Sequence, residues 1–422
     1  MDVLWGLGGM VALVGLGLLL SSDRRGVRWR TVLSALAIQV AFGVLVLYWP
    51  AGRTVLGKVT EGVQAVINSA NAGIGFLFGP VLPQGEDAGV VFAFQVLPVI
   101  VFFASLTAVL YHFGILQLVV EKLGAALGWA LGTREAESIN AAANIFVGQT
   151  EAPLVIRPYL GGLTRSGLFA VMVGGLSTVA GSVLVGYSLL GAPLEYLIAA
   201  SFMAAPGALM MAKLIEPERR DDEPPAEDEA ARDAIPPSGE EHDEDELEGM
   251  EYRNVIDAAA SGAADGLRLA LNIGAMLLAF ISLIALVNLL LGVVGGWFGN
   301  PELTFEQILG YVFAPLMTVI GVPWAEATGA GSFVGQKVVV NEFVAFSNFA
   351  PIIEDFSPKT AAIVTFALTG FANLGSLGIL LGGLGSLVKD RRREIAHLGL
   401  RAVAAGTLAN LMSATIAGIL IG

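Results

Sequence analysis

The string Gln149-Thr150-Glu151-Ala152-Pro153 and its later counterpart Asn341-Glu342-Phe343 decide how this chain folds. Each string places a carboxylate next to an amide or a hydroxyl inside otherwise apolar sequence, and a glycine, Gly148 or Gly335, lies shortly upstream. A carboxylate at membrane depth is costly, so it is normally there to bind, relay or couple something. Two such strings in comparable settings predict one site that is built from two halves.

The composition is that of a membrane protein. The chain is 55% hydrophobic and 14% charged, and its mean hydropathy is +0.73, whereas soluble proteins carry about 25% charged residues. Apolar stretches long enough to cross a bilayer recur along the chain, which indicates a polytopic helical protein. The first stretch, residues 1–20, lacks a basic n-region and a small-residue cleavage site, so we interpret it as a retained span. The absence of cysteine excludes disulfides and thiolate metal sites.

The net charge of −14 comes from one segment. Residues 216–251 hold 17 acidic and 3 basic residues, so the remainder of the chain is neutral. This segment is rich in Pro, Glu and Asp and poor in aromatic residues, which predicts a disordered, solvated loop.

We predict an all-α fold with eight transmembrane helices. The predicted spans are Val3–Leu20, Val32–Tyr48, Val91–Val119, Leu168–Leu190, Leu194–Leu214, Leu267–Leu291, Thr360–Leu387 and Leu398–Ile421. Basic clusters occur at residues 24–30 and 389–393. The positive-inside rule places both clusters in the cytoplasm, so both termini are expected outside.

Two polar, interrupted regions do not fit as simple spans. Residues 133–165 and 305–349 contain Gly, Pro, Asn, Gln, Thr and Glu where a lipid-facing helix would have none. Given the predicted topology, both are expected to be re-entrant hairpins that enter from opposite sides. Irregular backbone is tolerated at that depth only where it is buried in protein or lines a cavity. The amphipathic segment 55–78 is expected to be an interfacial helix on the outer surface.

An internal repeat accounts for this order. The string Phe146-Val147-Gly148-Gln149 returns as Phe333-Val334-Gly335-Gln336, and small-residue breaks follow at Ala180-Gly181-Ser182 and Ala372–Ser376. Inverted repeats with broken helices that meet near the midplane are typical of transporters. We therefore divide the chain into spans 1–3 (1–120), a first repeat (121–214), the acidic cytoplasmic loop (215–256), span 6 (257–300) and a second repeat (301–422).

The polar side chains of the two motifs favour a neutral ligand. They offer amides, hydroxyls and carboxylates but no basic residue, which disfavours an anionic or phosphorylated substrate. A ligand with hydroxyl and amide groups fits better, and Phe343 and Phe371 could pack against a planar ring. Structural alternatives remain open at this point. The carboxylates could bond exposed backbone at the hairpin tips, Gln149 and Asn373 could cap broken helices, and Asn144 could join helices.

The strings from Asn144 to Ile156, Asn341 to Ala345, and Gly370 to Asn373 followed by Ser376 resemble the concentrative nucleoside transporter family. The resemblance runs from about residue 91 to the C-terminus. It implies a homotrimer in the cell membrane whose protomers import nucleosides with an ion gradient. It also implies an elevator-type mechanism, in which hairpins and broken spans form a transport domain that slides against a scaffold made of residues 1–120 and 257–300.

The resemblance also implies the roles of individual residues. The nucleobase side of the family's site matches Gln149, Thr150 and Glu151, with Val183 packing against the base. The ribose side matches Glu342, Asn373 and Ser376, with Phe371 nearby. The family commonly has Ser-Ser where this chain has Gly375-Ser376, and the serine expected to contact ribose is retained.

The same resemblance implies a sodium site. Its members match Asn144 and Val147 on the first hairpin and Thr178 and Val179 in the following span. Side-chain and carbonyl oxygens of this kind suit a hard cation such as Na⁺. We expect Na⁺ as the coupling ion and no cofactor.

There are three alternatives to Na⁺-coupled nucleoside transport. A proton could replace Na⁺ on the same scaffold, with a carboxylate as the carrier. An intramembrane enzyme would need a nucleophile or metal cluster, but the chain has no Cys and no His-Glu-x-x-His motif. A channel would not need an enclosed site with two hairpins.

The expected partners are nucleosides, membrane lipid and further copies of the chain, and not nucleic acid.

Overall fold

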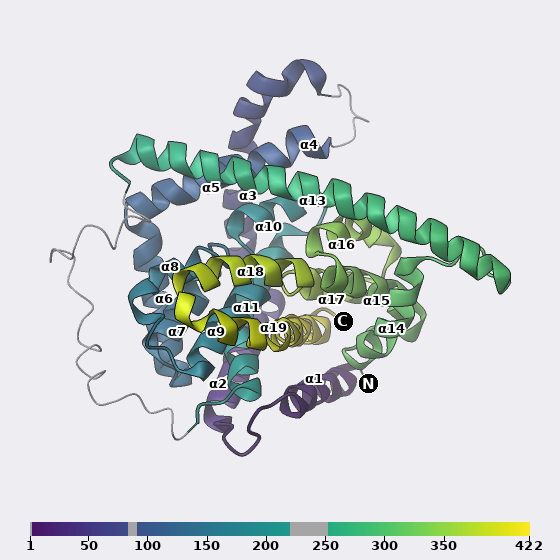
Figure 1. The fold of residues 1–422 in the computed structure, drawn as a ribbon, viewed down its shortest axis with the longest axis horizontal. Helices are drawn as coiled ribbons and strands as arrows, with labels where there is room; N and C mark the ends of the chain where they lie inside the picture. The colour runs from purple at the N-terminus through teal and green to yellow at the C-terminus, as the bar shows by residue number, and fades with distance from the viewer. Residues whose placement is uncertain (1, 83–90, 220–251) are drawn as a thin grey trace.

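The structure, a computed structural model, describes residues 2–82, 91–219 and 252–422, and the regular elements in these ranges are helices (Figure 1). Lipid offers no hydrogen-bond partners, so an apolar chain pairs its backbone groups within helices. The predicted all-α membrane fold is thereby confirmed. The acidic segment predicted to be disordered lies outside the described residues, except for residues 216–219.

Six helical stretches among the described residues are long and apolar enough to cross a membrane. They are Trp29–Tyr48, Phe92–His112, Arg165–Leu189, Leu194–Ile215, Val255–Trp297 and Lys389–Ile421. The two other predicted spans correspond to shorter apolar helices, namely Val3–Leu19 and the pair Pro358–Leu368 and Leu374–Leu387. The two helices of the pair are short because a break separates them. With the six long stretches, these shorter helices give each of the eight predicted spans a counterpart.

The N-terminal part begins with α1 (Asp2–Leu19) and α2 (Trp29–Gly43). A π-helical turn (Val44–Tyr48) leads into α3 (Pro50–Phe78), where Pro50 occupies a first-turn position that needs no N–H donor. The segment predicted as an interfacial helix therefore lies within one helix of 29 residues. That helix ends, as expected, where Gly79-Pro80 begins a 3₁₀ turn (Gly79–Val81).

The rest of the chain presents the same order of helices twice. The first set is α5 (Leu97–His112), preceded by the short α4 (Phe92–Gln95), then α6 (Ile115–Leu131), α7 (Glu135–Ala143), α8 (Ala152–Val155), α9 (Arg165–Ser177), α10 (Gly181–Leu189) and α11 (Leu194–Ile215). The second set is α13 (Val255–Trp297), α14 (Phe305–Val319), α15 (Trp324–Val339), α16 (Glu342–Phe349), α17 (Pro358–Leu368), α18 (Leu374–Leu387) and α19 (Arg392–Ile421). Three spans, the α9–α10 pair, α11 and α13, separate the hairpin α7–α8 from the hairpin α15–α16. Hairpins separated by an odd number of crossings enter from opposite sides.

A further helix precedes each hairpin. Helices α6 and α14 pack against the first helix of the hairpin that follows each of them. The predicted boundary between residues 120 and 121 falls inside α6, and the predicted second hairpin region, 305–349, includes α14 and a bend of 117° before α15. The third predicted span also ended too late, because Gly114 adopts a left-handed conformation (φ 71°) between α5 and α6.

Burial divides the helices into an inner and an outer group. The apolar windows of Arg165–Leu189 and Leu194–Ile215 are 94% and 89% buried, whereas that of Val255–Trp297 is only 6% buried. In Figure 1, α13 extends along one side of the whole molecule and lies next to α5, with which it packs. The first broken span and α11 therefore lie in the core, and the apolar surface of α13 faces away from it.

Candidate functional site

The two broken spans cross at their breaks. The backbone N–H of Phe371, in the break between α17 and α18, donates to the carbonyl of Thr178, in the break between α9 and α10, over 3.1 Å. Asn410 of α19 donates from its amide nitrogen to Ser177 O (2.6 Å) and to Thr369 O (2.9 Å). These carbonyls lie at helix ends and have no intrahelical partner. One buried amide thus holds both broken ends together.

Glu342 opens α16 at the tip of the second hairpin and is only 4% exposed. Its carboxylate accepts from the hydroxyl of Tyr187 (3.0 Å) and from the amide nitrogen of Asn373 (2.6 Å). The amide oxygen of Asn373 in turn accepts from Ser376 N (2.7 Å) and caps α18. The glutamate predicted to contact ribose is therefore anchored to the broken span that holds Asn373 and Ser376.

The tip of the first hairpin is fixed to the other break. Phe146 O accepts from Gly181 N over 3.0 Å, and Glu151 Oε2 accepts from Gly148 N over 3.1 Å within the tip. Gln149 lies close against α9, since a Cβ added to Gly175 would lie 2.8 Å from Gln149 Cβ. Gln149 Oε1 is buried and has no partner among the described residues. A buried acceptor of this kind is expected to receive a ligand donor.

One cavity of about 590 Å³ joins both tips and both breaks. Its volume falls in the range typical of small-molecule sites. The predicted substrate residues all line it, namely Gln149, Thr150, Glu151, Val183, Glu342, Phe371, Asn373 and Ser376. The fold thus brings together in one place residues that are up to 227 positions apart in the sequence.

Several residues that line or support this cavity were missed by sequence reasoning. Tyr187 of α10 holds Glu342, while Tyr111 near the end of α5 and Asn272 and Asp265 of α13 also line the cavity. Polar residues inside apolar spans were the available signal. They lie outside the repeated motifs, so nothing in the local sequence related them to the site.

The residues predicted to bind sodium lie beside the first hairpin tip, and their chemistry fits a hard cation. Asn144 is fully buried, and its Nδ2 donates to Asn140 O (2.8 Å) while its Oδ1 has no partner among the described residues. The hydroxyl of Thr178 donates to Gly174 O (2.8 Å), which leaves its oxygen lone pairs available. Val147 and Val179 are buried in the same region of the hairpin and the break. An unpaired buried oxygen carries a desolvation cost that a bound cation would remove.

Lys337, in the last turn of α15, is a further residue that sequence reasoning missed. It is fully buried, and its Nζ donates to Ala367 O (2.7 Å) and to Asn410 Oδ1 (2.8 Å). Asn410 therefore contacts Lys337 as well as both breaks. A lysine within an apolar hairpin was the signal that could have identified it.

Comparison with known proteins places the chain in a family. Models described as the N-terminus and the C-terminus of Na⁺ dependent nucleoside transporters match residues 8–81 and 196–418, and a model described as nucleoside recognition matches residues 93–194. The chain belongs to the concentrative nucleoside transporter family. Its relatives are transporters, so it is a transporter and not an enzyme.

Similar proteins of this family come from bacteria and animals. The nucleoside permease NupC of Helicobacter pylori is 47% identical over 423 residues and covers 98% of this chain and 97% of its own. The uncharacterized transporter YutK of Bacillus subtilis is 55% identical over 421 residues, with full coverage of both chains. Human solute carrier family 28 member 3 is 37% identical over 428 residues, which cover 98% of this chain but 59% of that protein.

Solved structures of the family member CNTnw share the fold. Its inward-facing, substrate-bound state matches with a TM-score of 0.90 at 51% identity, over 100% of this chain and 98% of that one. An outward-facing variant matches with a TM-score of 0.91 at 51% identity, with the same coverage.

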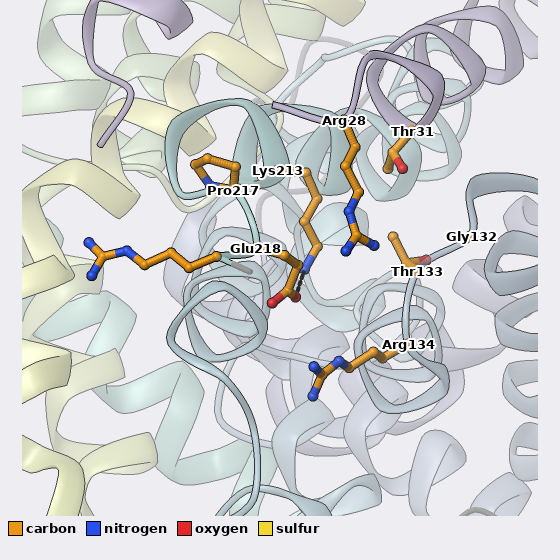
Figure 2. Close-up of a pocket in the computed structure, with 9 residues that line it drawn as sticks. Arg28, Thr31, Gly132, Thr133, Arg134, Lys213, Pro217 and Glu218 are labelled. Atoms are coloured by element: carbon orange, nitrogen blue, oxygen red, sulfur yellow. Dashed lines mark hydrogen bonds and ion pairs between the residues drawn. The ribbon is translucent and has the colours of Figure 1, made fainter. Parts of the chain in front are cut away.

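A charged cluster lies apart from the cavity of about 590 Å³ and ties the first hairpin to the core of this transporter. The Nζ of Lys213, near the end of α11, contacts Glu137 of α7 (2.8 Å), Glu218 (2.9 Å) and Ser166 of α9 (3.1 Å). Figure 2 shows Lys213 and Glu218 meeting beside Arg28, at a small cavity of about 70 Å³. Glu216 accepts from Arg165 and Arg401, each over 2.9 Å. The cluster connects α7, α9, α11 and α19, so we assign it a structural role.

Acid is expected to weaken this cluster at Glu218. Burial opposes ionisation of Glu218, but Lys213, Arg134 and Thr164 outweigh it and hold the pKa of its carboxyl below the ordinary value of 4.5. A lowered folded-state pKa means that the stabilisation is present above the unfolded-state pKa and is lost as the pH falls through the folded-state pKa. Thermal unfolding of the purified protein should therefore occur at a higher temperature than that of Glu218→Gln at neutral pH, with the difference shrinking below pH 4.5. A pH-independent difference would contradict the assigned ion pair.

Proposed function

We propose that this protein imports nucleosides across the cytoplasmic membrane by symport with Na⁺. The main observation behind this proposal is one cavity of about 590 Å³. The polar hairpin tips and the breaks of both repeats line it together. Family membership supports nucleosides as the substrate class, since relatives with assigned functions, such as the Helicobacter pylori permease, are named for nucleosides.

The two sides of the cavity suit the two parts of a nucleoside. On the first hairpin, Gln149 and Thr150 offer an amide and a hydroxyl for the edge of the base, and Glu151 accepts from its exocyclic donors. Val183 supplies a buried apolar contact for the ring. On the second hairpin, Glu342 keeps lone pairs beyond those occupied by Tyr187 and Asn373, so it can accept from ribose hydroxyls. Ser376 and Phe371 complete that side of the cavity.

Coupling follows from the position of the ion ligands. Asn144 and Val147 immediately precede Gln149 in the chain, and Thr178 lies in the break that Phe371 contacts. A Na⁺ ion bound by these oxygens would join the hairpin tip to the break and order both. The base then binds a tip that is already ordered, so the ion and the nucleoside bind with positive cooperativity.

Replacing Asn144 by Ala is expected to raise the Na⁺ concentration for half-maximal uridine uptake by roughly tenfold or more, as is typical when support of a metal ligand is lost. Uptake measured in proteoliposomes over a range of Na⁺ concentrations checks this. Asn71→Ala, at an exposed position of α3, is the matched control. An unchanged Na⁺ dependence would remove Asn144 from the ion site.

The proposed transport cycle uses an elevator movement in a homotrimer with both termini outside the cell. The buried broken spans and hairpins would form the moving part, and α13 with the N-terminal helices the fixed part. Exposed apolar side chains along α13 offer surface for lipid and for further copies of the chain. Native mass spectrometry in detergent tests the trimer, and protease access to tagged termini in intact cells tests the orientation.

A proton is the second candidate for the coupling ion, and the exposed side chain of Glu151 favours it. This carboxylate lines the cavity and accepts a backbone hydrogen bond from Gly148 N, so it could bind and release a proton. Uptake of radiolabelled uridine and adenosine, with Na⁺ and pH gradients imposed independently, separates the two ions. Absence of uptake for both nucleosides under either gradient would refute the proposed function.

A further inference from the structure

The ammonium of Lys337 is buried without a carboxylate beside it. In the described part of the chain no carboxylate oxygen lies within ion-pair distance of its Nζ, which donates to the neutral oxygens of Ala367 and Asn410. A buried charge without an ion-pair partner costs several kcal/mol unless its surroundings supply the opposite potential. The Glu342 carboxylate supplies part of that potential from beyond ion-pair distance.

The carbonyl end of α17 supplies the rest through direct contact. Ala367 is the residue before the last residue of α17, Leu368, so the ammonium lies at the negative end of this helix. Across the same break, Asn373 caps the N-terminus of α18, which is the positive end, and binds Glu342. The second hairpin thus places a cation and an anion, Lys337 and Glu342, at the two helix ends whose partial charges they complement.

The first half of the repeat has the same break but no internal cation. Helix α9 ends at Ser177, in the position that corresponds to the end of α17. Its hairpin carries no lysine or arginine between Arg134 and Arg157. The groups near this carbonyl end are all neutral. They are the amide nitrogen of Asn410, which donates to Ser177 O, together with Thr178 Oγ1 and the unpartnered Oδ1 of Asn144. The negative end of α9 therefore lacks the positive charge that Lys337 provides at α17.

We propose that Lys337 is the tethered counterpart of the coupling cation. Its covalently attached ammonium takes, at the carbonyl end of α17, the place that an ion from solution takes at the carbonyl end of α9. The likeness between Lys337 and the coupling ion rests on the proposed function. The placement of the Lys337 ammonium at the carbonyl end of α17 does not depend on it. Lys337 is thus a positioning residue that holds the break so that Asn373 and Glu342 face the nucleoside. Only the first half of the repeat then has to take up an ion in each cycle.

The test replaces the tethered cation by a free one. Lys337→Ser removes the ammonium and leaves space, whereas Lys337→Met removes the charge but fills the space. Thermal unfolding of both purified variants and of the wild type is measured in ammonium chloride and in choline chloride at equal ionic strength. We expect ammonium to raise the unfolding temperature of Lys337→Ser well above its value in choline, and to have little effect on Lys337→Met and the wild type. Equal responses of all three proteins would overturn the proposal.

A third variant covers the case in which Lys337→Ser does not fold in either salt. Lys337→Gln can still donate hydrogen bonds to Ala367 O and Asn410 Oδ1 but carries no charge. We expect its uridine affinity, measured by calorimetry, to fall by roughly tenfold, because the charge that positions Asn373 and Glu342 is lost. An affinity within twofold of the wild type would overturn the proposal. Failure of Na⁺-coupled uptake in the wild type would refute the proposed function alone, since the unfolding measurements use no gradient.

Discussion

Uridine uptake by Glu342→Gln is expected to fall by about 10- to 100-fold, because a hydrogen bond to a charged acceptor contributes roughly 1.5–3 kcal/mol. The wild-type carboxylate accepts from Tyr187 and Asn373 and retains lone pairs for the substrate. Glutamine has one acceptor oxygen, and its NH₂ group would face a donor, either the Tyr187 hydroxyl or the Asn373 amide. The substitution therefore disturbs both the substrate contact and the support of the break. Uptake of radiolabelled uridine into proteoliposomes provides the measurement.

Two controls separate this effect from misfolding. Glu354→Gln makes the same chemical change at an exposed position and should leave uptake unchanged. The elution volume of the purified Glu342→Gln variant should match that of the wild type, because the glutamate lies at a hairpin tip next to the cavity. Near-normal uptake by Glu342→Gln would remove this residue from the substrate site.

Gly370→Ala is expected to lower both thermal stability and uptake, with a loss of about 1–3 kcal/mol or more in unfolding free energy. Gly370 lies where the two breaks and α19 converge. A Cβ at this position would overlap Asn410 Oδ1 and would lie 2.7 Å from Ser177 O. Asn410 would have to move, and with it the contacts to Lys337, Ser177 and Thr369. Thermal unfolding and uridine uptake of the same preparation should therefore decrease together.

The matched control is Gly378→Ala in α18, where no atom lies within 4 Å of the added Cβ. Alanine favours helix over glycine, so this variant should be as stable as the wild type or slightly more stable. If Gly370→Ala behaved like Gly378→Ala, the close packing at the crossing of the breaks would not be needed for the fold.

Local sequence predicted those parts of the fold that depend on local chemistry. Apolar length identified the spans, and small residues at Ala180–Ser182 and Ala372–Ser376 located the breaks. The predicted substrate residues all line one cavity. Helix α14 was not separated from the second hairpin, because its apolar pattern continues into α15. Gly321 and Pro323 at the bend of 117° were the signal that could have separated them.

Sequence alone determined that this is a helical membrane protein with two polar hairpins, because hydrophobic length and the cost of buried charge act on each segment by itself. Only the tertiary structure decided how those charges are compensated. Tyr187 and Asn373 reach Glu342 from 155 and 31 positions away, and Asn410 contacts Lys337 from 73 positions away. Hydrogen bonds and helix-end potentials depend on distance in space, and no local pattern records which distant oxygen will face a buried ammonium.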